Sequence, residues 1–195
     1  MERRASEKNN AQSHRFQCDV AGRLLRRPQQ GEDWIIKGEE FFAYAEDMLR
    51  SADTLLFGRT TYLLMAGYWP FAAKDEIAEH MNHLAKVVFS GTLEKADWNN
   101  SRLVKTDAAE EVLRLKQQPG KDIVILGSAT LASFLLQQGL IDEYRVILNP
   151  VLIGAGNPLF KEIKQTLRLR LQQTKLFATG VVVLITKKHD PRPSF

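Results

Sequence analysis

The stretch Asp122-Ile123-Val124-Ile125-Leu126-Gly127-Ser128-Ala129-Thr130-Leu131 decides the fold, together with Thr54-Leu55-Leu56-Phe57-Gly58-Arg59-Thr60-Thr61-Tyr62. Each stretch is a short apolar run that ends on a glycine and leads directly into hydroxylated or small residues beginning a helical pattern. An apolar run without alternation is typical of a strand buried on both faces. The two stretches therefore indicate a parallel sheet in an α/β domain.

These two strand-to-helix junctions also suggest a ligand. Glycine lets the backbone approach a bound molecule, and the free N–H groups of the following helix favour anions. In open parallel sheets such junctions lie at the carboxyl ends of the strands, where they can face one crevice. Two phosphate-binding corners in one crevice suggest a dinucleotide.

The remaining pattern alternates between strands and helices until two long strands end the chain. Residues 41–50, 60–66, 74–85, 108–117 and 128–138 have helical periodicity, and residues 54–58, 86–90, 123–127, 143–153, 167–177 and 180–187 are apolar runs. This order predicts a mainly parallel central sheet with an antiparallel C-terminal strand pair and helices on both faces. We expect residues 54–58, 86–90 and 123–127 to be neighbouring parallel strands, with Gly58, Ser90 and Gly127 on one rim.

Composition limits the class of protein. With 195 residues, 44% of them hydrophobic, the chain is expected to form one domain with a full core. No apolar run approaches the ~20 residues that span a bilayer, and a lone cysteine, Cys18, fits a cytoplasmic protein. Residues 1–30 contain seven basic and three acidic residues. The rest of the chain therefore has 20 basic and 20 acidic residues and no net charge. We therefore expect neither a nucleic-acid partner nor a membrane partner.

Residues 1–30 differ from the rest because they hold many arginines and glutamines and no long apolar run. We interpret them as an irregular segment that contributes no central strand. The division that follows is an atypical segment over 1–30, a folded domain over 31–188 and a tail over 189–195.

From Trp34 onward the chain resembles the dihydrofolate reductase-like superfamily, and most closely the RibD C-terminal domain family. The matching segments are Ser51-Ala52-Asp53, Leu56 to Tyr62, Lys86 to Ser90, Ile125 to Leu131, Gly139 to Glu143, Asn149 to Gly156 and Thr179 to Leu184. The resemblance implies a three-layer fold, an NADPH site, a homodimer and a small-molecule substrate. It further implies a reductase of a pyrimidine or pterin-like heterocycle, similar to the 5-amino-6-(5-phosphoribosylamino)uracil reductase of riboflavin biosynthesis.

The same resemblance implies the cofactor-binding residues. Arg59 matches an arginine that meets the ribose 2′-phosphate, which a guanidinium can grip through charge-assisted bonds. The alternative is a surface arginine at a helix start. The other matching positions are Gly58, Thr60, Thr61, Ser90, Gly127, Ser128, Ala129, Thr130 and Leu131. Thr60 and Thr61 could equally be N-caps, and Ser90-Gly91-Thr92 could be a turn. The superfamily commonly has two or three consecutive glycines where this chain has only Gly127, which leaves Ser128 to add a hydroxyl donor.

The substrate half of the site is less evident. The family usually begins with a buried strand and a serine-leucine-aspartate-glycine-like turn, whereas this chain has Ala11-Gln12-Ser13-His14-Arg15-Phe16. This difference raises the alternative of a catalytically impaired relative, lacking the first strand, that binds nucleotide or dimerises. For a proton donor the candidates are Glu39 and Glu40, provided that one carboxyl is partly buried. Both could instead be helix-start acids that complement the dipole.

Two further patterns have a simpler interpretation. His80 and His83 could share a helix face and bind a metal, but no third ligand has suitable spacing, so we predict no metal site. Gly154-Ala155-Gly156 lacks the third glycine of a dinucleotide fingerprint, and Pro158 follows it, which indicates a tight turn.

Overall fold

The computed structural model describes residues 13–20, 35–126, 129–152, 163 and 166–188, with backbone only for 13–20. Its strands are β1 (Ser13–Val20), β2 (Ala52–Gly58), β3 (Ala85–Phe89), β4 (Ser101–Val104), β5 (Asp122–Leu126), β6 (Glu143–Asn149), β7 (Leu169–Leu176) and β8 (Val182–Lys188). Its helices are α1 (Glu39–Ser51), α2 (Arg59–Ala66), α3 (Glu76–His83), α4 (Ala108–Lys116) and α5 (Ala129–Gln137), with a 3-10 turn, η1 (Trp69–Phe71). No helix in these described ranges combines the length and the apolar character needed to cross a membrane.

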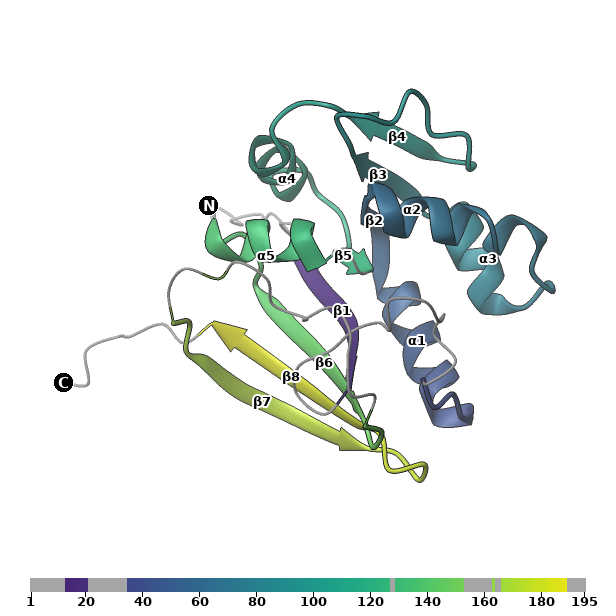
Figure 1. Ribbon diagram of the computed structural model, residues 1–195, viewed down its shortest axis with the longest axis vertical. Coiled ribbons are helices and arrows are strands. Elements are labelled where there is room, and N and C mark those ends of the chain that lie inside the picture. Colours follow the sequence, from purple (N-terminus) through teal and green to yellow (C-terminus); the bar gives the residue numbers. More distant parts are fainter. Residues whose placement is uncertain (1–12, 21–34, 127–128, 153–162, 164–165, 189–195) are drawn as a thin grey trace, which may run out of the picture.

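The strands form one sheet in the order β4-β3-β2-β5-β1-β6-β8-β7 (Figure 1). From β4 to β6 every neighbouring pair is parallel, whereas β8 is antiparallel to both β6 and β7. This arrangement confirms the mainly parallel sheet with an antiparallel C-terminal pair. It also confirms that β3, β2 and β5 are neighbouring parallel strands.

Strand β1 corrects the expectation that residues 1–30 contribute no central strand. Its backbone pairs with β5 from Ser13 to Phe16 and with β6 from His14 to Val20, so it lies in the middle of the sheet. A segment without an apolar run can still be a strand when neighbours on both sides fix its backbone, because strand propensity depends on context. The first strand is therefore present, which contradicts the part of the impaired-relative hypothesis that supposed it to be missing.

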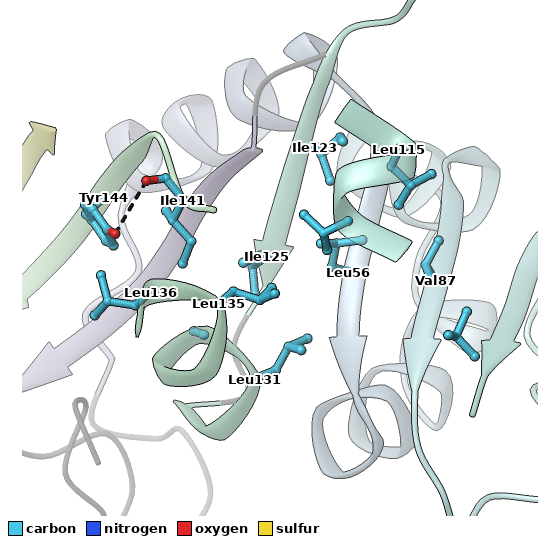
Figure 2. Close-up of a cluster of buried hydrophobic side chains, with 13 residues drawn as sticks. Leu56, Val87, Leu115, Ile123, Ile125, Leu131, Leu135, Leu136, Ile141 and Tyr144 are labelled. Atoms are coloured by element: carbon cyan, nitrogen blue, oxygen red, sulfur yellow. Dashed lines mark hydrogen bonds between the residues drawn. The ribbon is translucent and has the colours of Figure 1, made fainter. Parts of the chain in front are cut away.

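Helices cover both faces of the sheet, as expected. Residues of α4 and α5 pack against side chains that alternate along β2 and β5, among them Leu56, Ile123 and Ile125. Figure 2 shows Leu131, Leu135 and Leu136 of α5 in this cluster, together with Ile141 and Tyr144 near the start of β6. Residues of α1, α2 and α3 pack on the opposite face, against Leu55, Phe57 and Val124. Alternation along each strand thus divides the core into two layers.

The end of the sheet where β3 begins is held by buried polar contacts. Lys86 is 1% exposed, and its Nζ donates to the carbonyl oxygens of Asn82, Leu84 and Asn99 at 3.2, 2.8 and 2.9 Å. The ammonium also lies 4.5 Å from the Trp98 ring, and burial lowers the pKa of Lys86 to about 8. The Asn82 amide accepts from Trp98 Nε1–H at 2.7 Å and donates to the Trp69 carbonyl at 3.0 Å. These bonds tie α3, η1 and the 90–100 loop to β3.

Candidate functional site

The junction of β2 and α2 presents an exposed arginine and uncapped backbone donors. Gly58 ends β2 and is the N-cap of α2, and no side chain of the described residues caps this helix. Arg59 and Thr60 are exposed and Thr61 is half-buried. The two threonines are therefore not the N-caps that one interpretation proposed. The N–H groups of the first helical turn and the hydroxyls remain available to a ligand.

The position of α2 is fixed by Tyr62, which is 2% exposed. Its hydroxyl oxygen accepts the Trp98 backbone N–H at 2.9 Å, and its ring packs against Phe57 and Trp98 at centroid distances of 6.4 and 6.2 Å. These buried contacts hold the helix, while Arg59 makes no ion pair with any residue in the described ranges. The junction thus combines a well-held helix start with a cation that has no ion-pair partner in the described part of the chain.

Ser90 lies beside this junction, directly after β3. Gly58 and Phe89 are register partners, so Gly58 and Ser90 share one rim of the sheet, as predicted. The Ser90 Oγ accepts the backbone N–H groups of Thr92 and Leu93 at 3.2 and 3.0 Å. The serine therefore forms a turn, in agreement with the simpler interpretation, and among the described residues no acceptor takes its hydroxyl proton.

The third corner follows β5, whose register with β2 includes Leu56 opposite Ile125. Gly127 and Ser128 lie outside the described residues, so the predicted role of this glycine stays a prediction. Ala129 is half-buried and Thr130 is exposed at the start of α5. Leu131 is 7% exposed and packs in the core, so a contact with a ligand could involve only its backbone.

The rim of the sheet is stepped. Among the described residues, β5 pairs with β1 as far as Phe16 and Leu126, whereas β1 and β6 pair as far as Val20 and Asn149. These four further residue pairs carry the β1–β6 ladder about 13 Å beyond the end of β5, at ~3.3 Å per residue. A molecule bound at the β2, β3 and β5 corners would therefore lie beside the projecting ends of β1 and β6.

The two acidic candidates lie at the same rim, in the first turn of α1. Both Glu39 and Glu40 are exposed, which contradicts the partial burial that the proton-donor hypothesis requires. Glu40 Oε2 accepts the Ala178 backbone N–H at 2.5 Å and so connects α1 to the turn between β7 and β8. We therefore favour the interpretation of both as helix-start acids.

Asn149 is a rim residue for which the sequence predicted no role. Asn149 is the last residue of β6 and is 3% exposed. Its Oδ1 accepts the Ile36 backbone N–H at 2.9 Å. The only sequence signal was its place at the start of the matched segment Asn149 to Gly156. Burial of an amide cannot be predicted from residue type alone.

The remaining candidates give no site in the described part of the chain. His83 Nδ1 lies 2.8 Å from the carbonyl oxygen of Glu79, within its own helix. Among the described residues no three histidine, cysteine or acidic side chains are grouped to hold a metal. Gly154 to Gly156 lie outside the described residues.

Sequence comparisons identify relatives over most of the chain. The model of the RibD C-terminal domain matches residues 25–183. The Bacillus subtilis (strain 168) protein YyaP, described as uncharacterized, is 34% identical over 184 residues, covering 91% of this chain and 96% of its own. YwjB of the same organism, also described as uncharacterized, is 31% identical over 161 residues, covering 81% and 87%.

Solved structures share the fold at low sequence identity. A putative riboflavin biosynthesis protein from Shewanella sp. PV-4 has a TM-score of 0.74 at 18% identity, covering 92% of this chain and 99% of its own. A pyrimidine reductase-like protein from Corynebacterium diphtheriae has a TM-score of 0.67 at 13% identity, covering 93% of both chains. The diaminohydroxyphosphoribosylaminopyrimidine deaminase/5-amino-6-(5-phosphoribosylamino)uracil reductase of Thermotoga maritima has a TM-score of 0.66 at 12% identity, and 58% of that chain is covered. These structures show the fold, and the match of the family model over residues 25–183 establishes that the chain belongs to the RibD C-terminal domain family.

Proposed function

We propose that this protein is an NADPH-dependent reductase of a small heterocyclic substrate, pyrimidine or pyrimidine-derived such as a pterin. The observation that carries this proposal is the rim of β3, β2 and β5, where Gly58 is followed by Arg59, an arginine without an ion pair among the described residues, in a member of this family. The structure from Thermotoga maritima is described as a reductase of 5-amino-6-(5-phosphoribosylamino)uracil, and we take an aminouracil as the most specific substrate to test.

The residues at the β2–α2 junction fit the phosphates of NADPH. An exposed guanidinium without a carboxylate partner in the described structure matches a 2′-phosphate, and the uncapped N–H groups of α2 are anion donors. Thr60 and Thr61 add hydroxyls, and Ser90 can donate from the adjacent strand end. NADPH, when bound, supplies the hydride. The protein's part is to align the cofactor with the substrate and to exclude water.

The substrate would lie toward β1 and β6, beside the step in the rim. Since Glu39 and Glu40 are exposed, we assign no proton donor to either of them. The proton would then come from solvent or from the substrate's own ring nitrogens. The described residues would then contribute mainly by positioning the cofactor and the substrate, and not by acid catalysis from a side chain.

We also propose a homodimer in the cytoplasm. The edge strand β7 supports the dimer, because it is exposed along nearly its whole length and presents Leu171 and Leu176 at 55% and 71% exposure. In the described part of the chain β7 is an edge strand, and exposed leucines on an edge strand are typical of an interface with another chain. Sedimentation equilibrium would test the dimer, and a monomer at all concentrations would contradict it.

The function is tested by measuring NADPH oxidation at 340 nm with 5-amino-6-(5-phosphoribosylamino)uracil, beside calorimetric titrations of NADPH and NADH. We expect turnover that depends on the uracil compound and tighter binding of NADPH than of NADH. Equal binding of the two cofactors would contradict the role of Arg59. Absence of binding by either would contradict the reductase.

A further inference from the structure

Asn149 carries a buried hydrogen-bond donor without a partner. Its Nδ2 is fully enclosed and makes no hydrogen bond in the described structure. The orientation of the amide is fixed, because the Ile36 backbone N–H must face an acceptor and therefore faces Oδ1, at 2.9 Å. Rotating the amide would place two donors against each other. Both N–H groups of Nδ2 are thus directed away from Ile36.

An unmet buried donor is costly, so its retention calls for an explanation. Leaving such a group unsatisfied costs as much as its desolvation, and native proteins hold only a few of them. A leucine of similar volume would remove the unmet donor but would leave the Ile36 backbone N–H without its acceptor. The Oδ1 bond therefore explains the acceptor of this amide, and a ligand that brings an acceptor would explain its donor.

The location of Asn149 agrees with a ligand contact. It is the last residue of β6 and the register partner of Val20, at the top of the step in the rim. Ile147, two residues earlier, packs with Phe41 and Tyr44 of α1, so Asn149 is on the face of the sheet that α1 covers. Helix α2, with Arg59, covers this same face. The amide and the cofactor corner thus share one rim and one face.

We propose that Asn149 recognises the heterocyclic substrate by donating from Nδ2 to a ring carbonyl oxygen, while Oδ1 holds the chain before α1. A carbonyl is the matching chemistry because Nδ2 is a neutral donor, and a uracil ring offers two carbonyl oxygens. A charged phosphate would be bound more strongly by the guanidinium of Arg59. The inference rests on the proposed reductase function and adds the residue that reads the ring.

The test is Asn149→Asp, which retains an acceptor for Ile36 N–H and replaces the donor by an oxygen. Its matched control is Asn82→Asp, since both ends of the Asn82 amide already have partners within the protein. Titration with 5-amino-6-(5-phosphoribosylamino)uracil in the presence of NADP⁺ gives Kd, and NADPH oxidation gives KM and kcat. We expect Asn149→Asp to raise Kd and KM for the uracil compound about ten- to hundredfold, with NADPH affinity unchanged. Asn82→Asp should lower the Tm and leave the Kd and KM for the uracil compound unchanged.

A second readout separates recognition from folding. At low pH the introduced aspartate becomes protonated and regains an O–H donor, so affinity for the uracil compound should recover relative to the unmodified protein. Unchanged Kd in Asn149→Asp, with a normal Tm, would overturn the role of Asn149 alone. Binding of the uracil compound that depends on Asn149, without NADPH oxidation, would support Asn149 and overturn the reductase. No binding of the compound by the unmodified protein would overturn both.

Discussion

Lys86 at the start of β3 and two polar side chains at the opposite rim, Arg59 and Asn149, differ in whether the protein supplies their partners. Where β3 begins, Lys86 is buried and its ammonium donates to three carbonyls beside Trp98. At the opposite rim, Arg59 has no ion pair and Asn149 Nδ2 no hydrogen bond in the described structure. The bonds of Lys86 stabilise the fold, whereas the guanidinium of Arg59 and the Nδ2 of Asn149 are donors that a ligand could use. Changes at the first end should therefore affect stability, and changes at the rim should affect binding.

The largest effect is expected from Lys86→Met. The substitution removes the donor that the carbonyls of Asn82, Leu84 and Asn99 share. We expect the free energy of unfolding to fall by about 2–4 kcal/mol in urea denaturation, with NADPH affinity unchanged. Lys95→Met, at a lysine 77% exposed, is the control and should change stability little. A Lys86→Met variant of normal stability would show that the bonds of Lys86 do not stabilise the fold.

The pH dependence of stability tests the same lysine without a mutation. Burial lowers its pKa to about 8 from 10.5, so between these values the unfolded chain binds more protons than the folded one. Stability should then rise with pH across this interval, by at most about 3 kcal/mol from this group. Urea denaturation from pH 7.5 to 10.5 measures the rise, and Lys86→Met provides the reference in which it is absent. Parallel curves for the two proteins would show that the lysine does not titrate there.

At the rim, Arg59→Ala should weaken NADPH binding ten- to hundredfold, on the order of 1.5–3 kcal/mol. NADH binding should stay unchanged, because NADH lacks the 2′-phosphate that the guanidinium would grip. Since Arg59 makes no ion pair in the described structure, the Tm should also stay unchanged. Calorimetric titration of both cofactors, with Arg102→Ala as a control at an arginine paired to Glu111, decides the matter. An equal loss for both cofactors would show that Arg59 does not read the 2′-phosphate.

Much of this arrangement could be predicted from the sequence, and the exceptions have physical causes. Strands β2, β3 and β5 are continuous apolar runs, and burial on both faces selects such runs directly. Strand β1, with the sequence SHRFQCDV, has no such run, and its backbone is fixed by β5 and β6, which come later in the chain. Strand β4 was missed because it is a four-residue edge strand.

The candidate site divides in the same way. Gly58, Arg59 and Ser90 could be found because a strand end followed by a helix or turn is a local pattern. Lys86 and Asn149 could not, since their roles depend on contacts with Asn99 and Ile36, at separations in sequence of 13 and 113 residues. Whether a polar side chain has a hydrogen-bond partner depends on the tertiary structure and cannot be predicted from residue type.

A smaller effect is expected at the start of β5, from Gly120→Ala. A Cβ at Gly120 would lie 2.4 Å from Asp53 Oδ2, the oxygen that accepts the Lys121 backbone N–H at 2.7 Å. The carboxylate must move and lose that bond, which should lower the free energy of unfolding by about 1 kcal/mol. Gly91→Ala is the control, because no atom lies within 4 Å of a Cβ there. Since Gly120 is at the end of the sheet opposite the rim, NADPH affinity should not change.

The smallest effect is expected from Glu39→Gln and Glu40→Gln, which test whether the rim holds an acid catalyst. Glutamine retains an oxygen that can accept the Ala178 N–H, so Glu40→Gln should lose only the charge of that bond and part of the dipole interaction. We expect each variant to change the free energy of unfolding by less than about 1 kcal/mol and to leave kcat unchanged. The two carboxyls are exposed, and an exposed acid exchanges its proton with water, which can itself supply the proton. Steady-state kinetics over pH 5–9 provides the measurement. A fall in kcat of tenfold or more in either variant, at normal Tm, would make that glutamate the proton donor and would place an acid catalyst at the rim.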